Sequence, residues 1–249
     1  MILTKPSVRR SVYSLSWLFC AACAGTPGAE PHDMSATQHE AMASQEESAA
    51  AAHAKQYDAH ASDTREKCKY QGRGPRERAT AVCWTSETNP TDEHRKDAAD
   101  HQKRASDHRA ASKVLVDAET AACAGISDQD RDTSPFFHRE DIASVAPLFS
   151  ITAGTSRGPQ TRVLRGATVT FRATPGLTEE WLQRIVDCHI ARNGAVGHEM
   201  PEMPYCPLVP GGVSAAVRST GDGFAVVMQT DNPASAAEVL KRAQSLVAH

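Results

Sequence analysis

The chain has 249 residues, a formal net charge of −3 and only 5% aromatic residues. The length is enough for one or two domains, but the scarcity of aromatic residues and a mean hydropathy of −0.44 argue against one large core. The charge shows no basic excess and therefore no sign of a nucleic-acid partner. We expect one compact part and one thin part.

The first 22 residues have the pattern of an export signal. Lys5, Arg9 and Arg10 precede the apolar run SVYSLSWLFCAA at 11–22, and the segment has no acidic residue. The run is too short to span a bilayer as a permanent helix. Residues 1–22 are therefore predicted to be a signal peptide. Their removal leaves 24 basic and 30 acidic residues, a net charge near −6.

Cys23 follows small residues and precedes the polar stretch AGTPGAEPHD. This order resembles the signal of bacterial lipoproteins, in which a cysteine receives the lipid and a flexible tether follows. Cys20 departs from the pattern, since that family usually has Leu there. The resemblance implies lipid attachment at Cys23, a tether at 23–34, and a membrane anchor without a spanning helix. The residue after Cys23 is Ala24 and not Asp, which would be an inner-membrane retention signal in that family. The resemblance therefore implies an outer-membrane lipoprotein facing the periplasm or the surface.

A second interpretation of the same residues is an ordinary secretory cleavage after Ala24. Ala22, Cys23 and Ala24 also satisfy the small-x-small rule of signal peptidase sites. The product would then be a secreted or periplasmic soluble protein. The rest of the chain resembles no characterised family.

Five further cysteines follow the signal region. Because disulfides persist outside the cytosol, an exported chain is expected to use them. Five is an odd number, so one thiol stays free or pairs with another chain. We expect two disulfides and one leftover thiol, namely Cys68–Cys83, Cys188–Cys206 and a free Cys123.

Residues 35–124 are predicted to form an alanine-rich antiparallel helical hairpin or coiled coil. Ser35 and Gln38 have capping-box spacing, and the stretch up to Cys68 is dominated by Ala, Glu, Gln and Lys. A second helical stretch begins at Thr91 and is stopped by Gly125. Glycines and prolines between them indicate a loop, so we expect two helices of about 30 residues, each about 45 Å long.

Histidine alternates with alanine at heptad spacing along both predicted helices. The histidines are His39, His53 and His60 in the first helix and His94, His101 and His108 in the second. A turn centred near residue 77 would bring His60 opposite His94 and His53 opposite His101. The pattern alone does not fix this register, because two series of period seven can be slid past each other.

The histidines allow three interpretations. Residues seven apart on one helix are separated by about 10.5 Å, so they cannot share an ion with ligand distances of ~2.0–2.1 Å. A Zn or Cu site would need ligands from both helices, such as His60, His94 and Asp97. The plain alternative is solvated or packed histidines in a polar coil. The third is a pH-responsive seam, in which facing histidines repel each other when charged, so that helicity falls between about pH 7 and 5.

The predicted hairpin contains few large apolar side chains, so burial provides little stabilisation. A Cys68–Cys83 disulfide would close the connecting loop and contribute about 3 kcal/mol. Stabilisation by a partner or by self-association through the helical hairpin is the other possibility. The chain then passes through a connector at 125–144.

Residues 145–249 are predicted to form a compact α/β domain. GATVTFRAT alternates apolar and polar residues as a half-buried strand does, and TEEWLQRIVDCHIARNGA follows as a helix capped by Thr178. VSAAVRST-GDG-FAVVMQT is a hairpin pattern, and Asn232-Pro233 starts a last helix. The fold class is therefore α+β, a helical hairpin followed by a small two-layer β-α-β-β-α sandwich, with LFSIT as a possible further strand.

The loop HEMPEMPYCP has the most chemically reactive composition in the domain. His198, Met200 and Met203 offer the imidazole and thioether ligands that Cu(I) prefers. The alternative is structural: a Cys188–Cys206 disulfide pins the loop, the methionines cap the core, and His189 is a buried, hydrogen-bonded histidine.

No glycine-rich phosphate loop, HExxH or GxSxG motif occurs in the chain, so we expect no catalytic residues, no cofactor and no enzymatic activity. The expected function is that of an exported, lipid-anchored envelope protein acting as a structural or partner-binding module. Its partners would be the membrane, through the lipid, and a protein or second copy at the helical hairpin. The alternative is a periplasmic Cu- or Zn-binding protein.

Overall fold

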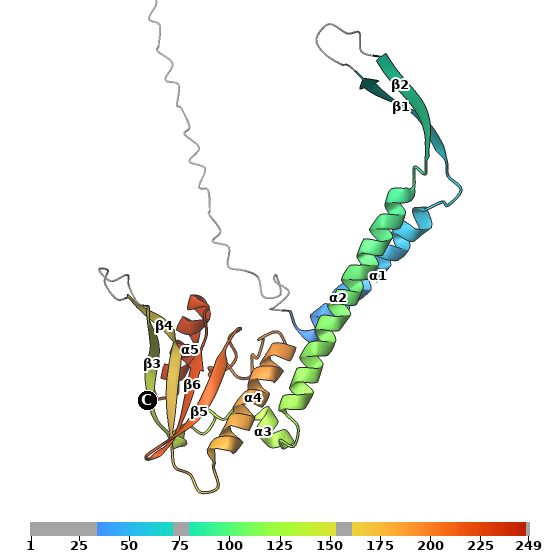
Figure 1. Ribbon diagram of the computed structural model, residues 1–249. Helices are drawn as coiled ribbons and strands as arrows, with labels where there is room; N and C mark the ends of the chain where they lie inside the picture. Colours follow the sequence, from blue (N-terminus) through green and yellow to red (C-terminus); the bar gives the residue numbers. More distant parts are fainter. Residues whose placement is uncertain (1–33, 72–79, 153–160, 248–249) are drawn as a thin grey trace, which may run out of the picture.

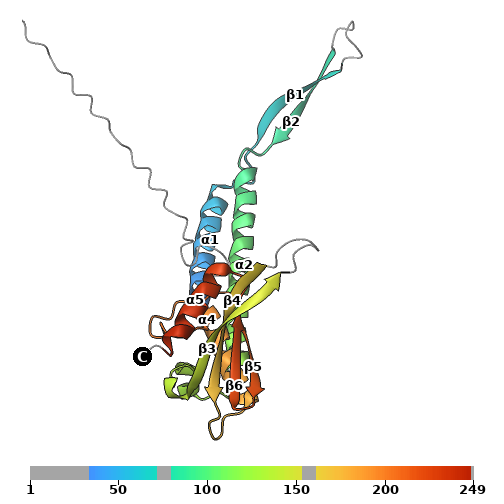
Figure 2. The same ribbon diagram turned by 90° about the vertical axis from the view of Figure 1, so that its left-hand side faces the viewer.

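The computed structural model describes residues 34–71, 80–152 and 161–247. The predicted signal peptide, Cys23 and nearly all of the tether lie outside these residues. The described part consists of a long arm and a compact α/β domain, as Figures 1 and 2 show. No helix in the described residues is both long and apolar enough to cross a membrane.

Two antiparallel helices form the lower part of the arm, which we call the stem: α1 (Ala36–Gln56) and α2 (Asp92–Ala122). The predicted capping box is present, since Ser35 Oγ accepts from Gln38 N at 3.1 Å and Ser35 N donates to Gln38 Oε1 at 2.7 Å. α1 is shorter than predicted. After Gln56, the carbonyl of Asp58 accepts hydrogen bonds from the side chains of Asn89 and Thr91 instead of continuing the helix.

A two-stranded antiparallel ribbon extends beyond the stem where the sequence predicted the end of a helix and a loop. It is formed by β1 (Asp63–Gln71) and β2 (Thr80–Thr88). Cys68 lies directly opposite Cys83, and the two form the predicted disulfide. β2 contains Val, Trp and Thr, which favour strands, and this long-range pairing overrides the helical composition of residues 63–68.

The compact domain contains a four-stranded antiparallel sheet in the order β3-β4-β6-β5. Its strands are β3 (Ile142–Thr152), β4 (Thr161–Arg172), β5 (Ser214–Thr220) and β6 (Gly223–Gln229). The helices α4 (Glu179–Ala195) and α5 (Pro233–Ser245) cover one face of the sheet. The predicted α+β sandwich is confirmed, with β3 as the further strand.

The core lies between this sheet and its two helices. Ala167, Val169 and Phe171 alternate along β4 and are buried, and they lie opposite Met228, Val226 and Phe224 of β6. Ala215 and Val217 of β5 pair with the same two β6 residues, Met228 and Val226. The turn before β6 depends on Gly223, whose φ is 153°, because an added Cβ would lie 2.0 Å from the Phe171 carbonyl oxygen.

The connector between the stem and the domain forms α3 (Asp128–Asp132) and a 3-10 turn (Arg139–Asp141). Phe136 is fully buried in the core between them and contacts the ring of Phe171 at a centroid distance of 5.6 Å. This buried phenylalanine fixes the connector to the domain. The far end of α2 lies beside α4 in Figure 1.

Candidate functional site

The seam between α1 and α2 is closed by alanines. Ala43, Ala50, Ala98 and Ala105 are all at least nine-tenths buried, whereas few large apolar side chains are available on either helix. Small side chains let two helices approach closely, so packing is achieved here with little apolar area. The predicted alternation of alanine and histidine along the seam is therefore confirmed.

The histidines of the seam face each other in a register different from the one considered above. His39 Nδ1 is 3.0 Å from His108 Nδ1, and His53 Nδ1 is 3.2 Å from His94 Nδ1. The ring of His101 stacks on that of His53 at a centroid distance of 5.3 Å. The facing pairs fit the pH-responsive interpretation in their geometry alone, and that interpretation stays a prediction.

The metal ligands predicted in the stem are only partly brought together. His94 and Asp97 belong to one cluster, but their third member is His53 and not His60. His60 is exposed, and its backbone N–H donates to Asp58 Oδ1. His60 does not join the cluster because α1 ends at Gln56, so His60 lies beyond the helix.

Glu46 forms the centre of a second polar group in the seam. Its Oε2 accepts from His101 Nδ1 at 2.6 Å and from Arg104 Nε at 2.9 Å. The hydrogen bonds from His101 and then Arg104 lower the pKa of Glu46 below its usual value. The composition of the seam did not indicate this group, since it depends on the register between the helices.

The β1–β2 ribbon presents two different faces to solvent. On one face Lys67 lies opposite Trp84 and Lys69 opposite Val82, with Arg65 next along the strand. Trp84 is 48% exposed and Val82 52% exposed, so two large apolar side chains lie next to each other on this face in solvent. The disulfide occupies the other face. The ribbon therefore combines basic and apolar side chains on the face opposite its cross-link.

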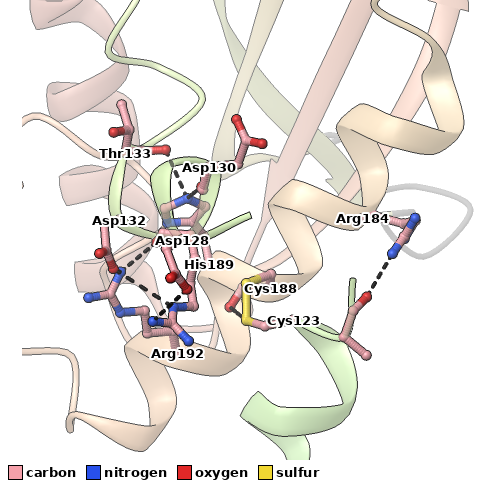
Figure 3. The surroundings of a disulfide bond; sticks show 11 residues. Cys123, Asp128, Asp130, Asp132, Thr133, Arg184, Cys188, His189 and Arg192 are labelled. Atoms are coloured by element: carbon pink, nitrogen blue, oxygen red, sulfur yellow. Dashed lines mark hydrogen bonds and ion pairs between the residues drawn. A yellow bond between two sulfur atoms is a disulfide. The ribbon is translucent and has the colours of Figure 1, made fainter. Parts of the chain in front are cut away.

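A second disulfide joins the stem to the domain, and it corrects our prediction. Cys123, the C-cap of α2, is bonded to Cys188 in α4, as Figure 3 shows. Nearby, Arg184 Nη2 donates to the carbonyl of Ala124 at 2.7 Å, and Arg192 pairs with Asp132 at 2.8 Å. Cys123 is thus not a leftover thiol, because the docking of α2 on α4 brings it to Cys188.

Among the cysteines that the structure describes, Cys206 is the one outside a disulfide, and it is fully buried. Ser134 Oγ donates a hydrogen bond to its Sγ at 3.2 Å. Burial raises the pKa of the Cys206 thiol, so the group stays neutral and unreactive in the folded chain. The predicted Cys188–Cys206 bond is wrong because Cys206 points into the core beneath α5 while Cys188 faces the stem.

His189 is fully buried next to this junction and has the predicted structural role. Its Nε2–H donates to the carbonyls of Asp130 and Thr133, at 3.0 and 3.1 Å (Figure 3). Burial lowers the pKa of His189 below its usual value, and these two hydrogen bonds oppose the lowering only in part. The imidazole is therefore neutral, and it secures α3 against α4.

The methionine loop does not display its side chains as copper ligands. Met200 and Met203 are buried in the hydrophobic core, 6% and 4% exposed. His198 has a φ of 62°, and its ring Nδ1 bonds the carbonyl of Val209 at 2.9 Å. The structural interpretation of the loop therefore holds for its methionines, which pack into the core of the domain.

A cleft of about 320 Å³ lies between the connector and the start of α4. Trp181, Leu182 and Ile185 line one side, and the side chains of His138 and Asp141 contribute to the other. His138 Nδ1 lies 3.2 Å from Glu140 Oε1, and both groups are exposed. The cleft lies beside the junction, since Asp130 and Thr133, which bond His189, also line it.

Comparison with known protein families, curated proteins and solved structures finds no match for this chain.

Proposed function

We propose that this protein is an exported, lipid-anchored envelope protein that acts as a structural and partner-binding module. In this proposal Cys23 carries the lipid, the stem carries the ribbon at its far end from Ser35, and the ribbon contacts a protein partner. The observation that carries the proposal is the solvent exposure of the ribbon. All its described side chains between 63–69 and 81–88 are exposed or half-buried.

A bare two-stranded ribbon is only marginally stable in water. This chain nevertheless places one at the end of a stem of two helices and cross-links it through Cys68 and Cys83. Both strands also leave an unpaired edge, which can accept another strand. A two-stranded ribbon that packs against no other part of the described chain adds little to the stability of the fold. We therefore expect it to serve in binding a partner.

The charges of the arm indicate the chemistry of that partner. Residues 63–88 contain six basic and four acidic residues, whereas stem residues 35–62 and 89–122 contain seven basic and eleven acidic ones. The two strands themselves carry three basic and three acidic residues, but they are distributed unequally between the faces. Arg65, Lys67 and Lys69 lie on the face of Trp84 with Asp63 as the only acid of the two strands there, whereas Glu66 and Glu87 lie on the disulfide face. Arg65, Lys67 and Lys69 with the exposed Trp84 fit an acidic protein surface that has an apolar contact point.

Export is supported by two separate features. The first 23 residues resemble a lipoprotein signal, and both disulfides join groups that the fold places together. Structural disulfides persist in oxidising compartments and are rare in the cytosol. Together these features favour the cell envelope as the location.

The test is site-specific photo-cross-linking in intact cells. A photoreactive amino acid at position 84 should give a cross-linked product, and one at Asp222, in the exposed turn of the compact domain, should not. Charge reversal by Lys67→Glu together with Lys69→Glu should reduce the yield at position 84. Thr85→Glu, on the disulfide face, is the matched control and should leave it unchanged. Equal yields at positions 84 and 222, or no effect of the reversal, would contradict the proposal.

A further inference from the structure

Three potential metal ligands from both helices meet near the top of the stem. Among the described residues, His53 of α1 and His94 and Asp97 of α2 place one ligand atom each within 4.8 Å of the others. His53 Nδ1 lies 3.2 Å from His94 Nδ1 and 3.5 Å from Asp97 Oδ2. We propose that these three side chains bind one divalent cation of the zinc type.

The spacing of the ligand atoms fits such an ion. Ligands bound tetrahedrally at ~2.0–2.1 Å from zinc lie about 3.3 Å from one another, by the geometry of a tetrahedron. The two separations from His53 Nδ1, 3.2 and 3.5 Å, are close to this value. In this proposal the ion takes the place of the contact between the two imidazoles.

The secondary structure places the ligands without strain. His94 and Asp97 are three residues apart on α2, so their side chains lie on one face of the helix. His53 is in the last turn of α1, opposite them. The side chains of His53 and Asp97 are 28% and 42% exposed, so an ion can enter from solvent and a water can take the fourth position. His101 is not a member of this group of ligands, and its Nδ1 bonds Glu46.

The ligand types select the class of ion. Two imidazoles and one carboxylate suit zinc and similar transition metals, whereas Mg²⁺ and Ca²⁺ prefer oxygen ligands alone. No thiolate takes part, which disfavours Cu(I). The ion would join the end of α1 to the start of α2, directly below the ribbon. Its role is to fix the register of two helices that are held mainly by alanines.

Two other groups in the arm are poorer candidates. Glu66, Cys68 and Cys83 also lie close together, but the disulfide consumes both thiolates. The pair His39 and His108 belongs to no group of three potential ligands within the described residues. It therefore provides a control, since it has the same kind of imidazole contact outside the proposed cluster.

The experiment is titration of the purified mature protein, without a histidine tag, with Zn²⁺ by calorimetry at about pH 7.5, where imidazole is neutral. We expect one bound ion per chain and a higher thermal midpoint with the ion than without it. His94→Gln and Asp97→Asn should each weaken binding on the order of tenfold or more. His108→Gln and His198→Gln should leave the affinity unchanged.

Circular dichroism without metal checks that each variant keeps its helices. If His94→Gln loses them, the half-exposed Asp97→Asn still decides the question. Binding with unchanged affinity in both ligand variants would place the ion elsewhere and overturn the proposal, as would the absence of binding by the wild type. The zinc site does not depend on the proposed partner-binding face of the ribbon. Trp84→Ala should therefore leave the affinity for Zn²⁺ unchanged.

Discussion

Cys123 at the end of α2 is covalently joined to Cys188 in the middle of α4. The bond spans 65 residues of sequence and connects the stem to the compact domain at the point where the chain leaves α2. His189 and Arg192 of α4 also contact the connector, so the junction is held by a disulfide, hydrogen bonds and an ion pair. The placement of the end of α2 beside α4 follows from this junction.

The first prediction concerns this bond. Peptide mapping of the unreduced protein should recover Cys123 linked to Cys188 and Cys68 linked to Cys83. Replacing both Cys123 and Cys188 by Ser should lower the free energy of unfolding by about 2–4 kcal/mol, because the disulfide closes a long loop. Replacing Cys68 and Cys83 by Ser is the control, and it should leave the unfolding of the compact domain unchanged. A peptide linking Cys188 to Cys206 would show that the junction is wrong.

The second prediction concerns the free thiol. Cys206 is buried and its pKa is raised, so a maleimide should label it only slowly in the folded protein and rapidly in denaturant. Labelling is measured by mass spectrometry on the peptide that contains Cys206. Ser134→Ala removes the hydrogen bond to Sγ but leaves the thiol buried. The rate at which maleimide labels Cys206 in this folded variant should therefore stay as low as in the folded wild type. Rapid labelling of the folded wild type would be inconsistent with the packing of α5 over this loop.

The third prediction concerns the pH dependence of stability. Because burial lowers the pKa of His189, the unfolded chain binds a proton at this residue below about pH 6.5 while the folded chain does not. The free energy of unfolding should therefore fall as the pH drops from about 6.5 towards the folded-state pKa of His189.

Urea denaturation at several pH values measures this effect. His189→Gln keeps a donor for the carbonyls of Asp130 and Thr133 but cannot take up the proton, so its stability should decline less than that of the wild type over this range. His138→Gln, at an exposed position, should behave as the wild type does. Parallel pH curves for wild type and His189→Gln would mean that His189 is not a buried neutral imidazole.

The fourth prediction tests the close approach of α1 and α2. Ala43 is fully buried in the seam, and Leu at this position would force the helices apart at a cost of about 1–3 kcal/mol. Ala51 is exposed on the same helix, and Leu there should have little effect on the midpoint of thermal unfolding measured by circular dichroism. If the two variants unfold alike, the helices do not pack through Ala43.

The sequence predicted those elements that depend on local pattern. Ser35 and Gln38 marked the start of α1, and the alternation of Ala167, Val169 and Phe171 marked β4 and its buried face. Such signals need only neighbouring residues, because capping and strand alternation act over a few positions. The α+β class followed from the order of these elements.

The features that the sequence did not predict depend on contacts between distant residues. The helical composition up to Cys68 concealed β1, which exists because it pairs with β2. The partner of Cys188 could not be chosen from spacing, because it depends on how α2 docks on α4. The metal cluster likewise needed the register of the stem, which placed His53 and not His60 beside His94.

The most direct test of the account is the intact mass of the protein isolated from its native cell envelope. We expect a chain that begins at Cys23, carries the added mass of acyl chains, and retains both disulfides. A cytosolic protein that keeps Met1 and has every cysteine reduced would contradict the proposed anchoring and location.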